Sequence, residues 1–180
     1  MNIDNHVENR RKLRKACKPQ TPIKFLVIGE SPPKSGEYFY KPTDLRKGSK
    51  RLPAQIFRAI FKADEAYKAT YEEYLNRLQQ QYAFYLDDLS EIPLNCIDTE
   101  TRIEMINSGL DNFLSRINSL RLSADCQKTL VLPEKTLSEL TQNNKELFQK
   151  IIEALNLTRD DVCSFSELEY HISRHWTLLQ

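Results

Sequence analysis

Short apolar runs alternate along the chain with longer segments in which apolar residues recur at helical spacing. Residues 24–29 (Lys-Phe-Leu-Val-Ile-Gly) form an apolar run that ends in glycine, which predicts a strand buried on both faces. Three further short runs predict strands at residues 83–87, 129–132 and 161–165. Apolar spacing predicts helical segments at residues 53–78, as one helix or as two with a break near 63–64, then at 99–120, 133–155 and 166–179.

Two of these helices carry start signals in the sequence. Asp98 and Thr99 are good helix-start residues before a clean apolar stripe, and Pro133 and Glu134 suit a first helical turn. A strand–helix pattern repeated four times requires crossover connections, which produce a parallel sheet with helices on both faces. We therefore predict a single α/β domain over residues 21–180, preceded by a basic N-terminal extension over residues 1–20.

Composition narrows the class of protein. In 180 residues, 40% are apolar and 28% charged, which is typical of a soluble globular domain. The net charge of +1 supplies no overall field for nucleic acid or anionic lipid, so such binding would need a local patch. No apolar run approaches the roughly 20 residues of a membrane span. The N-terminus is too polar for a secretory signal, so we expect a cytoplasmic protein without a membrane partner.

The cysteines give no sign of a metal site. Cys17, Cys96, Cys126 and Cys163 stand singly, without a CxxC pair and without a histidine at zinc-ligand spacing. We expect reduced thiols, several of them buried, and neither a metal nor a cofactor.

The first twenty residues are strongly basic. Two interpretations are open: a solvated, partly helical extension, or an arm that contacts nucleic-acid phosphates. In the second, the predicted backbone contacts are Arg10, Arg11, Lys12, Arg14 and Lys15.

The loop after the first strand is the richest in candidate chemistry. Ligands of open parallel sheets bind where the loops meet at the carboxyl ends of the strands. Glu30 places a carboxylate there to activate water, and three consecutive aromatic residues suit stacking on a flat ligand. Alternatively, the aromatic rings plug the end of the sheet and Glu30 caps a helix. The candidate binding residues of this loop are Gly29, Ser31, Pro32, Pro33, Gly36, Tyr38, Phe39 and Tyr40.

Two other strand-end loops add candidates. Residues 87–95 offer paired carboxylates, which suit either a metal or acid–base work. Of these we select Asp87 as the second catalytic candidate, and Asn95 as a substrate contact. Lys135, at a helix start after the third strand, is a further substrate contact. We predict that the loops of Glu30, Asp87 and Lys135 converge on one pocket. In the alternative, these residues are solvated or cap turns.

The order Gly29-Glu30-Ser31-Pro32-Pro33, with Gly36 and Tyr38-Phe39-Tyr40 downstream, resembles the first motif of the uracil-DNA glycosylase-like superfamily. It is most similar to a bacterial branch with a GESPP…YFY signature, in which a strand like residues 84–89 and a Pro93-Leu94-Asn95 turn recur. The resemblance covers about residues 24–135. It implies a three-layer α/β/α sandwich around a four-stranded, mostly parallel sheet.

The resemblance also implies roles for particular residues. Glu30 would position the hydrolytic water, and Phe39 or a neighbouring tyrosine would stack on a flipped base. Asp87 falls where many relatives have an asparagine that reads the base edge. The relatives' second catalytic motif, His-Pro-Ser or similar, is missing from residues 164–175, where His171 and His175 are the candidate substitutes. With an incomplete catalytic set, we expect base excision to be slow or absent.

Three functions are therefore open. The protein is an enzyme that binds or excises a nucleobase in DNA, a non-catalytic binder of nucleic acid or protein, or a hydrolase of a small nucleotide-like substrate that uses Glu30 and Asp87. A basic patch around the crevice would favour the first two functions. An enclosed acidic pocket would favour the third.

Overall fold

A computed structural model of the chain describes residues 3–35, 38–41, 51–62 and 69–176. Seven helices and four strands lie in these ranges, with a short 3₁₀ turn, Arg159–Asp161, before the last strand. In chain order they are α1 (Ile3–Ala16), β1 (Ile23–Gly29), α2 (Leu52–Phe61), α3 (Tyr71–Tyr82), β2 (Phe84–Asp88), α4 (Thr99–Asn118), β3 (Leu122–Leu132), α5 (Glu134–Gln142), α6 (Lys145–Leu155), β4 (Val162–Ser164) and α7 (Leu168–His175).

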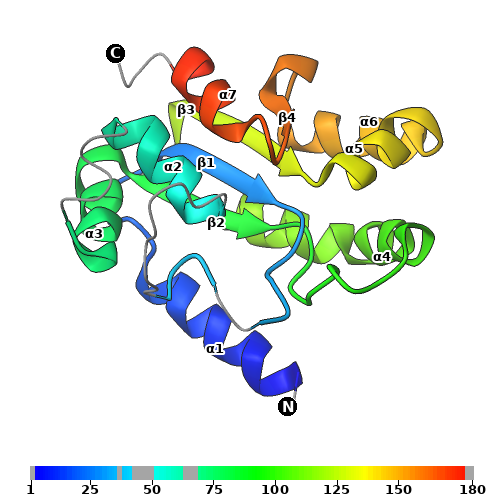
Figure 1. Cartoon of the computed structure of the whole chain (residues 1–180), viewed down its shortest axis with the longest axis horizontal. Helices are drawn as coiled ribbons and strands as arrows, with labels where there is room; N and C mark the ends of the chain where they lie inside the picture. The colour runs from blue at the N-terminus through cyan, green and yellow to red at the C-terminus, as the bar shows by residue number, and fades with distance from the viewer. Residues whose placement is uncertain (1–2, 36–37, 42–50, 63–68, 177–180) are drawn as a thin grey trace.

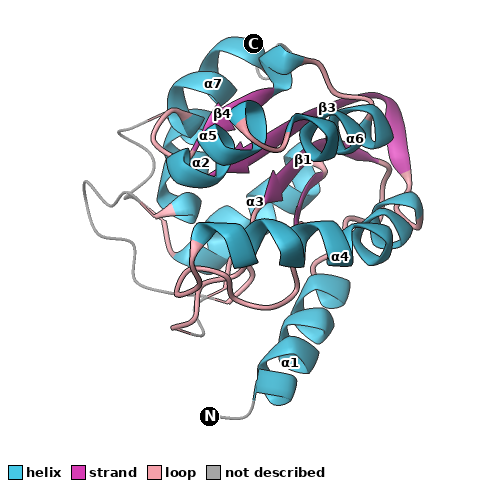
Figure 2. Cartoon of the chain, turned by 90° about the vertical axis from the view of Figure 1, so that its right-hand side faces the viewer, coloured by secondary structure: helices cyan, strands magenta, loops and turns pink. Residues whose placement is uncertain are grey.

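The four strands form one sheet in the order β2-β1-β3-β4, and every neighbouring pair is parallel. Helices cover both faces of the sheet (Figures 1 and 2). Helices α2 and α3 connect β1 to β2 and lie with α7 on one face, where α2 packs against α7. Helices α4, α5 and α6 pack together on the other. The predicted three-layer α/β sandwich with a four-stranded parallel sheet is confirmed.

Several element boundaries differ from the predictions. The segment at 53–78 is two helices, because Lys62 after α2 has a φ of 62° that a helix cannot continue through. The segment at 133–155 is also two helices, which separate at Asn143 and Asn144. Strand β3 begins seven residues earlier than predicted, since its first half is only partly buried and carries polar residues. No helix in the described ranges is both long enough and apolar enough to cross a membrane.

The start of α4 follows the predicted signal. The Asp98 carboxylate accepts a hydrogen bond from the Thr101 backbone N–H at 2.9 Å, which satisfies one of the free amides of the first turn. Helix α4 therefore begins at Thr99 as expected, and it carries Arg102 and Arg116 toward the carboxyl ends of the strands.

The basic N-terminal segment is an integral part of the domain. Helix α1 lies against the chain that follows β2, and Arg10 and Arg14 are buried there. Arg14 forms ion pairs of 2.7 Å with both Asp87 and Glu91. These contacts differ from the solvated extension that one interpretation of the sequence expected. The sequence of this segment does not reveal them, because the carboxylates that accept them lie some seventy residues further along the chain.

Candidate functional site

The loops after β1 and β2 are joined by hydrogen bonds. Both follow adjacent parallel strands, whose register pairs Gly29 with Asp88. The connecting bonds run from the Ser90 N–H to the Glu30 carbonyl (2.9 Å), from the Leu94 N–H to Ser31 Oγ (3.1 Å) and from the Lys34 N–H to Asn95 Oδ1 (3.2 Å).

These loops enclose one side of a cavity of about 270 Å³ at the carboxyl ends of the strands. Two carboxylic acids, Glu30 and Asp88, line it together with Ser31, Asn95 and Arg51. Its remaining wall is largely apolar or aromatic and consists of Gly29, Pro33, Tyr38, Phe39, Leu52, Pro53, Val131, Pro133 and Phe165. The strand-end cavity therefore combines two carboxyl groups and one arginine with a largely apolar wall.

Asp88 lies against the backbone of Gly29. A Cβ atom on Gly29 would stand 2.4 Å from Asp88 Oδ1, so the carboxyl group occupies the space that a side chain there would fill. Asp88 is 5% exposed, and no described residue donates a hydrogen bond to its carboxyl oxygens. Burial and the neighbouring Asp87 raise the pKa of Asp88 to about 7, against the opposing effect of nearby arginines.

Glu30, by contrast, is held by partners on two helices. Its Oε1 accepts hydrogen bonds from Thr136 Oγ1 in the first turn of α5 and, at 3.5 Å, from Arg102 on α4. Burial raises the pKa of Glu30, while both partners favour the ionised form. The cavity is thus lined by Glu30, which accepts from two donors, and by Asp88, whose pKa of about 7 leaves it partly protonated at neutral pH. Two carboxyl groups in such unlike environments can serve as a base and an acid.

Asp87, the predicted second catalytic residue, lies outside this cavity. Its carboxylate is 1% exposed and accepts hydrogen bonds from Arg14 Nη1 at 2.7 Å and from Arg116 Nη2 at 3.3 Å. Successive side chains of a strand point to opposite faces, and here Asp88 rather than Asp87 lines the cavity.

The three aromatic residues divide between site and core. Tyr38 and Phe39 line the cavity, although both are buried, and Phe39 also packs against Phe84 with ring centroids 5.4 Å apart. Tyr40 lies in the core, because its hydroxyl donates to the Leu86 carbonyl and accepts from the Leu86 N–H. Tyr40, a predicted binding residue, therefore does not line the strand-end cavity, and the backbone of β2 engages its hydroxyl group.

The other predicted binding residues are placed as follows. Pro33, Ser31 and Asn95 line the strand-end cavity, whereas Pro32 lines a small separate cavity beneath it. Lys135 lines a neighbouring hollow of about 700 Å³ that shares Pro133 and Phe165 with the strand-end cavity. Gly36 lies outside the described residues.

Most of the predicted phosphate-contacting residues have intramolecular partners. Arg11 pairs with Glu91 at 2.6 Å, and Arg10 donates to the Glu91 carbonyl at 3.0 Å. Arg14 is buried between Asp87 and Glu91, and Lys12 is exposed near Glu8. Lys15 is exposed.

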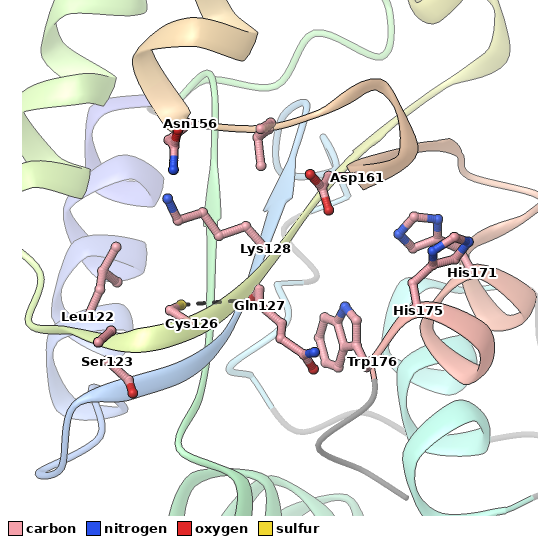
Figure 3. A pocket seen from close by; sticks show the side chains of 12 residues that line it. Leu122, Ser123, Cys126, Gln127, Lys128, Asn156, Asp161, His171, His175 and Trp176 are labelled. Atoms are coloured by element: carbon pink, nitrogen blue, oxygen red, sulfur yellow. Dashed lines mark hydrogen bonds between the residues drawn. The ribbon is translucent and has the colours of Figure 1, made fainter.

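The two C-terminal histidines lie at a different cavity, of about 330 Å³, along the first half of β3 (Figure 3). Their rings stack at 4.7 Å, and His171 Nε2 is 3.2 Å from Thr129 Oγ1. No residue lining this cavity also lines the strand-end cavity. The structure therefore does not bring His171 or His175 to Glu30.

Sequence reasoning missed three residues of the site, Asp88, Arg102 and Thr136. The alternation of side chains along a strand was a signal for Asp88. Neighbouring side chains point to opposite faces of the sheet, so Asp87 and Asp88 were not expected to reach the same site. Arg102 and Thr136 come from the first turns of two helices, and only their packing over the strand ends brings them to Glu30. Among the described residues, no three His, Cys, Asp or Glu side chains gather as metal ligands.

Comparisons with known proteins add no relative. No family model matches the chain, and no curated protein or solved structure is significantly similar to it. The resemblance to the uracil-DNA glycosylase-like superfamily stays a prediction.

Proposed function

We propose that the protein hydrolyses the N-glycosidic bond of a small nucleobase-containing molecule in the strand-end cavity. One observation carries this proposal: Glu30 and Asp88 line the same apolar cavity, the first held by hydrogen-bond donors and the second without them. Two carboxyl groups in unlike environments supply a base and an acid at the same pH.

The cavity walls suit a flat, mostly apolar ring. Phe39, Val131 and Phe165 provide apolar surface, while Asn95 offers both a donor and an acceptor. The carboxyl groups accept hydrogen bonds from ring N–H or amino groups. A nucleobase combines these properties, with apolar faces and a polar edge.

The reaction uses each carboxyl group once. Glu30 takes a proton from water as the water oxygen bonds to the sugar carbon C1′. The C1′–N bond breaks, and its electron pair stays on the base nitrogen. Asp88, in its protonated form, donates its proton to the departing base, so that no base anion has to be stabilised. This role replaces the histidine motif that the sequence lacks.

The charges around the cavity favour a small substrate over DNA. Arg14 of α1 is paired with Asp87 and Glu91, so it is not free to bind phosphate, and the cavity is lined by two carboxyl groups, Glu30 and Asp88, with one arginine, Arg51. Such a pocket offers a polyanion little attraction but accepts a neutral nucleoside. Of the three functions open from the sequence, these features support the hydrolase of a small nucleotide-like substrate.

The test is release of free base from uridine, cytidine, adenosine, guanosine and their 5′-monophosphates, followed by chromatography. We expect release from at least one nucleoside, and a 100- to 1000-fold loss in Glu30→Gln and in Asp88→Asn. The matched control is Glu100→Gln, which changes an exposed carboxylate on α4. No release by the wild type from any of these compounds would contradict the proposal, as would full activity in both variants.

A further inference from the structure

Asp88 lies between two cavities. Besides the strand-end cavity, it lines a small cavity of about 10 Å³ on its inner side. The walls of the small cavity come from α1 and from the loops after β1 and β2, and they consist of Val7, Arg10, Arg14, Pro32, Tyr38, Asp88 and Glu91.

Two polar atoms of this lining have no hydrogen-bond partner among the described residues. They are Tyr38 Oη and Arg10 Nε, each fully buried, and the two side chains are 6% and 8% exposed. A buried polar atom without a partner costs free energy, and native structures usually satisfy it with protein or with an ordered water. A volume of about 10–15 Å³ holds one water when two to four polar partners surround it.

We propose that the small cavity is a binding site for one water molecule, which bridges Tyr38 Oη, Arg10 Nε and the carboxyl group of Asp88. Arg10 donates to the water oxygen, and the water donates to Asp88. Tyr38 completes its coordination as donor or acceptor. Arg10 and Tyr38 are thereby positioning residues: they hold the inner side of Asp88 while its other side faces the strand-end cavity. The catalytic consequence rests on the proposed function, whereas the water site does not.

The same arrangement makes α1 part of the site. Arg10 carries a positive charge close to Asp88 and favours its ionised form, as do Arg14 and Arg116. The opposing groups are burial and Asp87. The charged and titratable groups around Asp88 come from several elements, with Glu91 in the lining of the small cavity and Glu30 in that of the strand-end cavity. The others are Arg10 and Arg14 from α1, Arg116 from α4, Asp87 from β2, and Tyr38 from the loop after β1.

The experiment measures the titration of Asp88 by carbon-detected NMR in the full chain without substrate. Tyr38→Phe removes only the hydroxyl, and Arg10→Met removes the charge at similar length. Both remove a group that supports the carboxylate, so we expect each variant to raise the pKa of Asp88 by about one unit. Lys15→Gln is the matched control, since Lys15 is exposed on the same helix and does not line the small cavity, and it should leave this pKa unchanged.

A high-resolution crystal structure of the wild type supplies the second measurement. Density for one water within hydrogen-bond distance of Tyr38 Oη, Arg10 Nε and Asp88 supports the inference. A dry cavity overturns it, and so does an Asp88 pKa that is the same in the wild type and in Tyr38→Phe. If Arg10→Met does not fold, the pKa of Asp88 in the conservative Tyr38→Phe variant tests the inference by itself. Because neither measurement uses a substrate, a bound water without base release would defeat the proposed reaction alone.

Discussion

At the residue scale, Gly29 and Asp88 depend on each other. The Gly29→Ala variant would place a methyl group 2.4 Å from Asp88 Oδ1, so the carboxyl group must rotate away. Since the displaced atom is the end of a side chain, we expect little loss of thermal stability but about a 100-fold loss of base release. Gly109→Ala in α4 is the control, because nothing lies within 4 Å of its added methyl group. Equal activity in the two alanine variants would contradict the assignment of Asp88.

Asp88 also predicts a pH dependence of stability. Its pKa is about 7 in the folded protein and about 4 in an unfolded chain, so folding favours the protonated form. The stabilising contribution of this proton is complete below pH 4 and is lost as the pH rises to 7. Asp88→Asn carries no such charge. We therefore expect the free energy of unfolding of Asp88→Asn, measured in urea relative to that of the wild type, to rise by about 1–3 kcal/mol between pH 4.5 and pH 8.5. A difference in the free energy of unfolding between variant and wild type that stays constant across this pH range would contradict the prediction.

At the element scale, α1 is held to the domain by buried ion pairs. Replacing Arg14 with alanine leaves the Asp87 carboxylate with one arginine, the more distant Arg116 at 3.3 Å instead of 2.7 Å, and with the Asp88 backbone N–H at 2.8 Å. Removing one partner of a buried ion pair lowers the free energy of unfolding by about 3 kcal/mol, which denaturant unfolding would measure. Lys15→Ala, an exposed change on the same helix, should cost less than about 0.5 kcal/mol. Similar costs for both variants would show that α1 is bound loosely.

At the scale of the whole molecule, charge decides between DNA and smaller substrates. The net charge of +1 supplies no overall attraction for a polyanion, and Arg11 and Arg14 of α1 are already paired with carboxylates, so they are not available to neutralise phosphates. We expect release of uracil from single-stranded or mismatched DNA to be slow or undetectable, measured beside the nucleosides at the same enzyme concentration. Robust release from DNA that disappears in Glu30→Gln would reverse this conclusion and restore the first of the three functions.

The pattern along the chain predicted what depends on local burial and local hydrogen bonding. The apolar run at residues 24–29 indicated the central strand because both faces of β1 are covered by helices. Asp98 indicated the start of α4 because a cap needs only the next three residues. The succession of strands and helices then determined a parallel sheet, and hence the edge of the molecule at which Glu30 lies.

Only the tertiary structure decided which side chains meet at that edge. Arg14 reaches Asp87 across 73 positions of sequence, and Thr136 reaches Glu30 across 106. No periodicity records such pairs, since each partner looks like an ordinary surface residue in its own segment. The packing of α1 buried Arg14, a residue of an apparent tail, as a partner of Asp87, while Asp88 is the carboxyl group of β2 that lines the cavity. The acid–base pair proposed here is a product of that packing, because it sets Asp88 in an environment unlike that of Glu30.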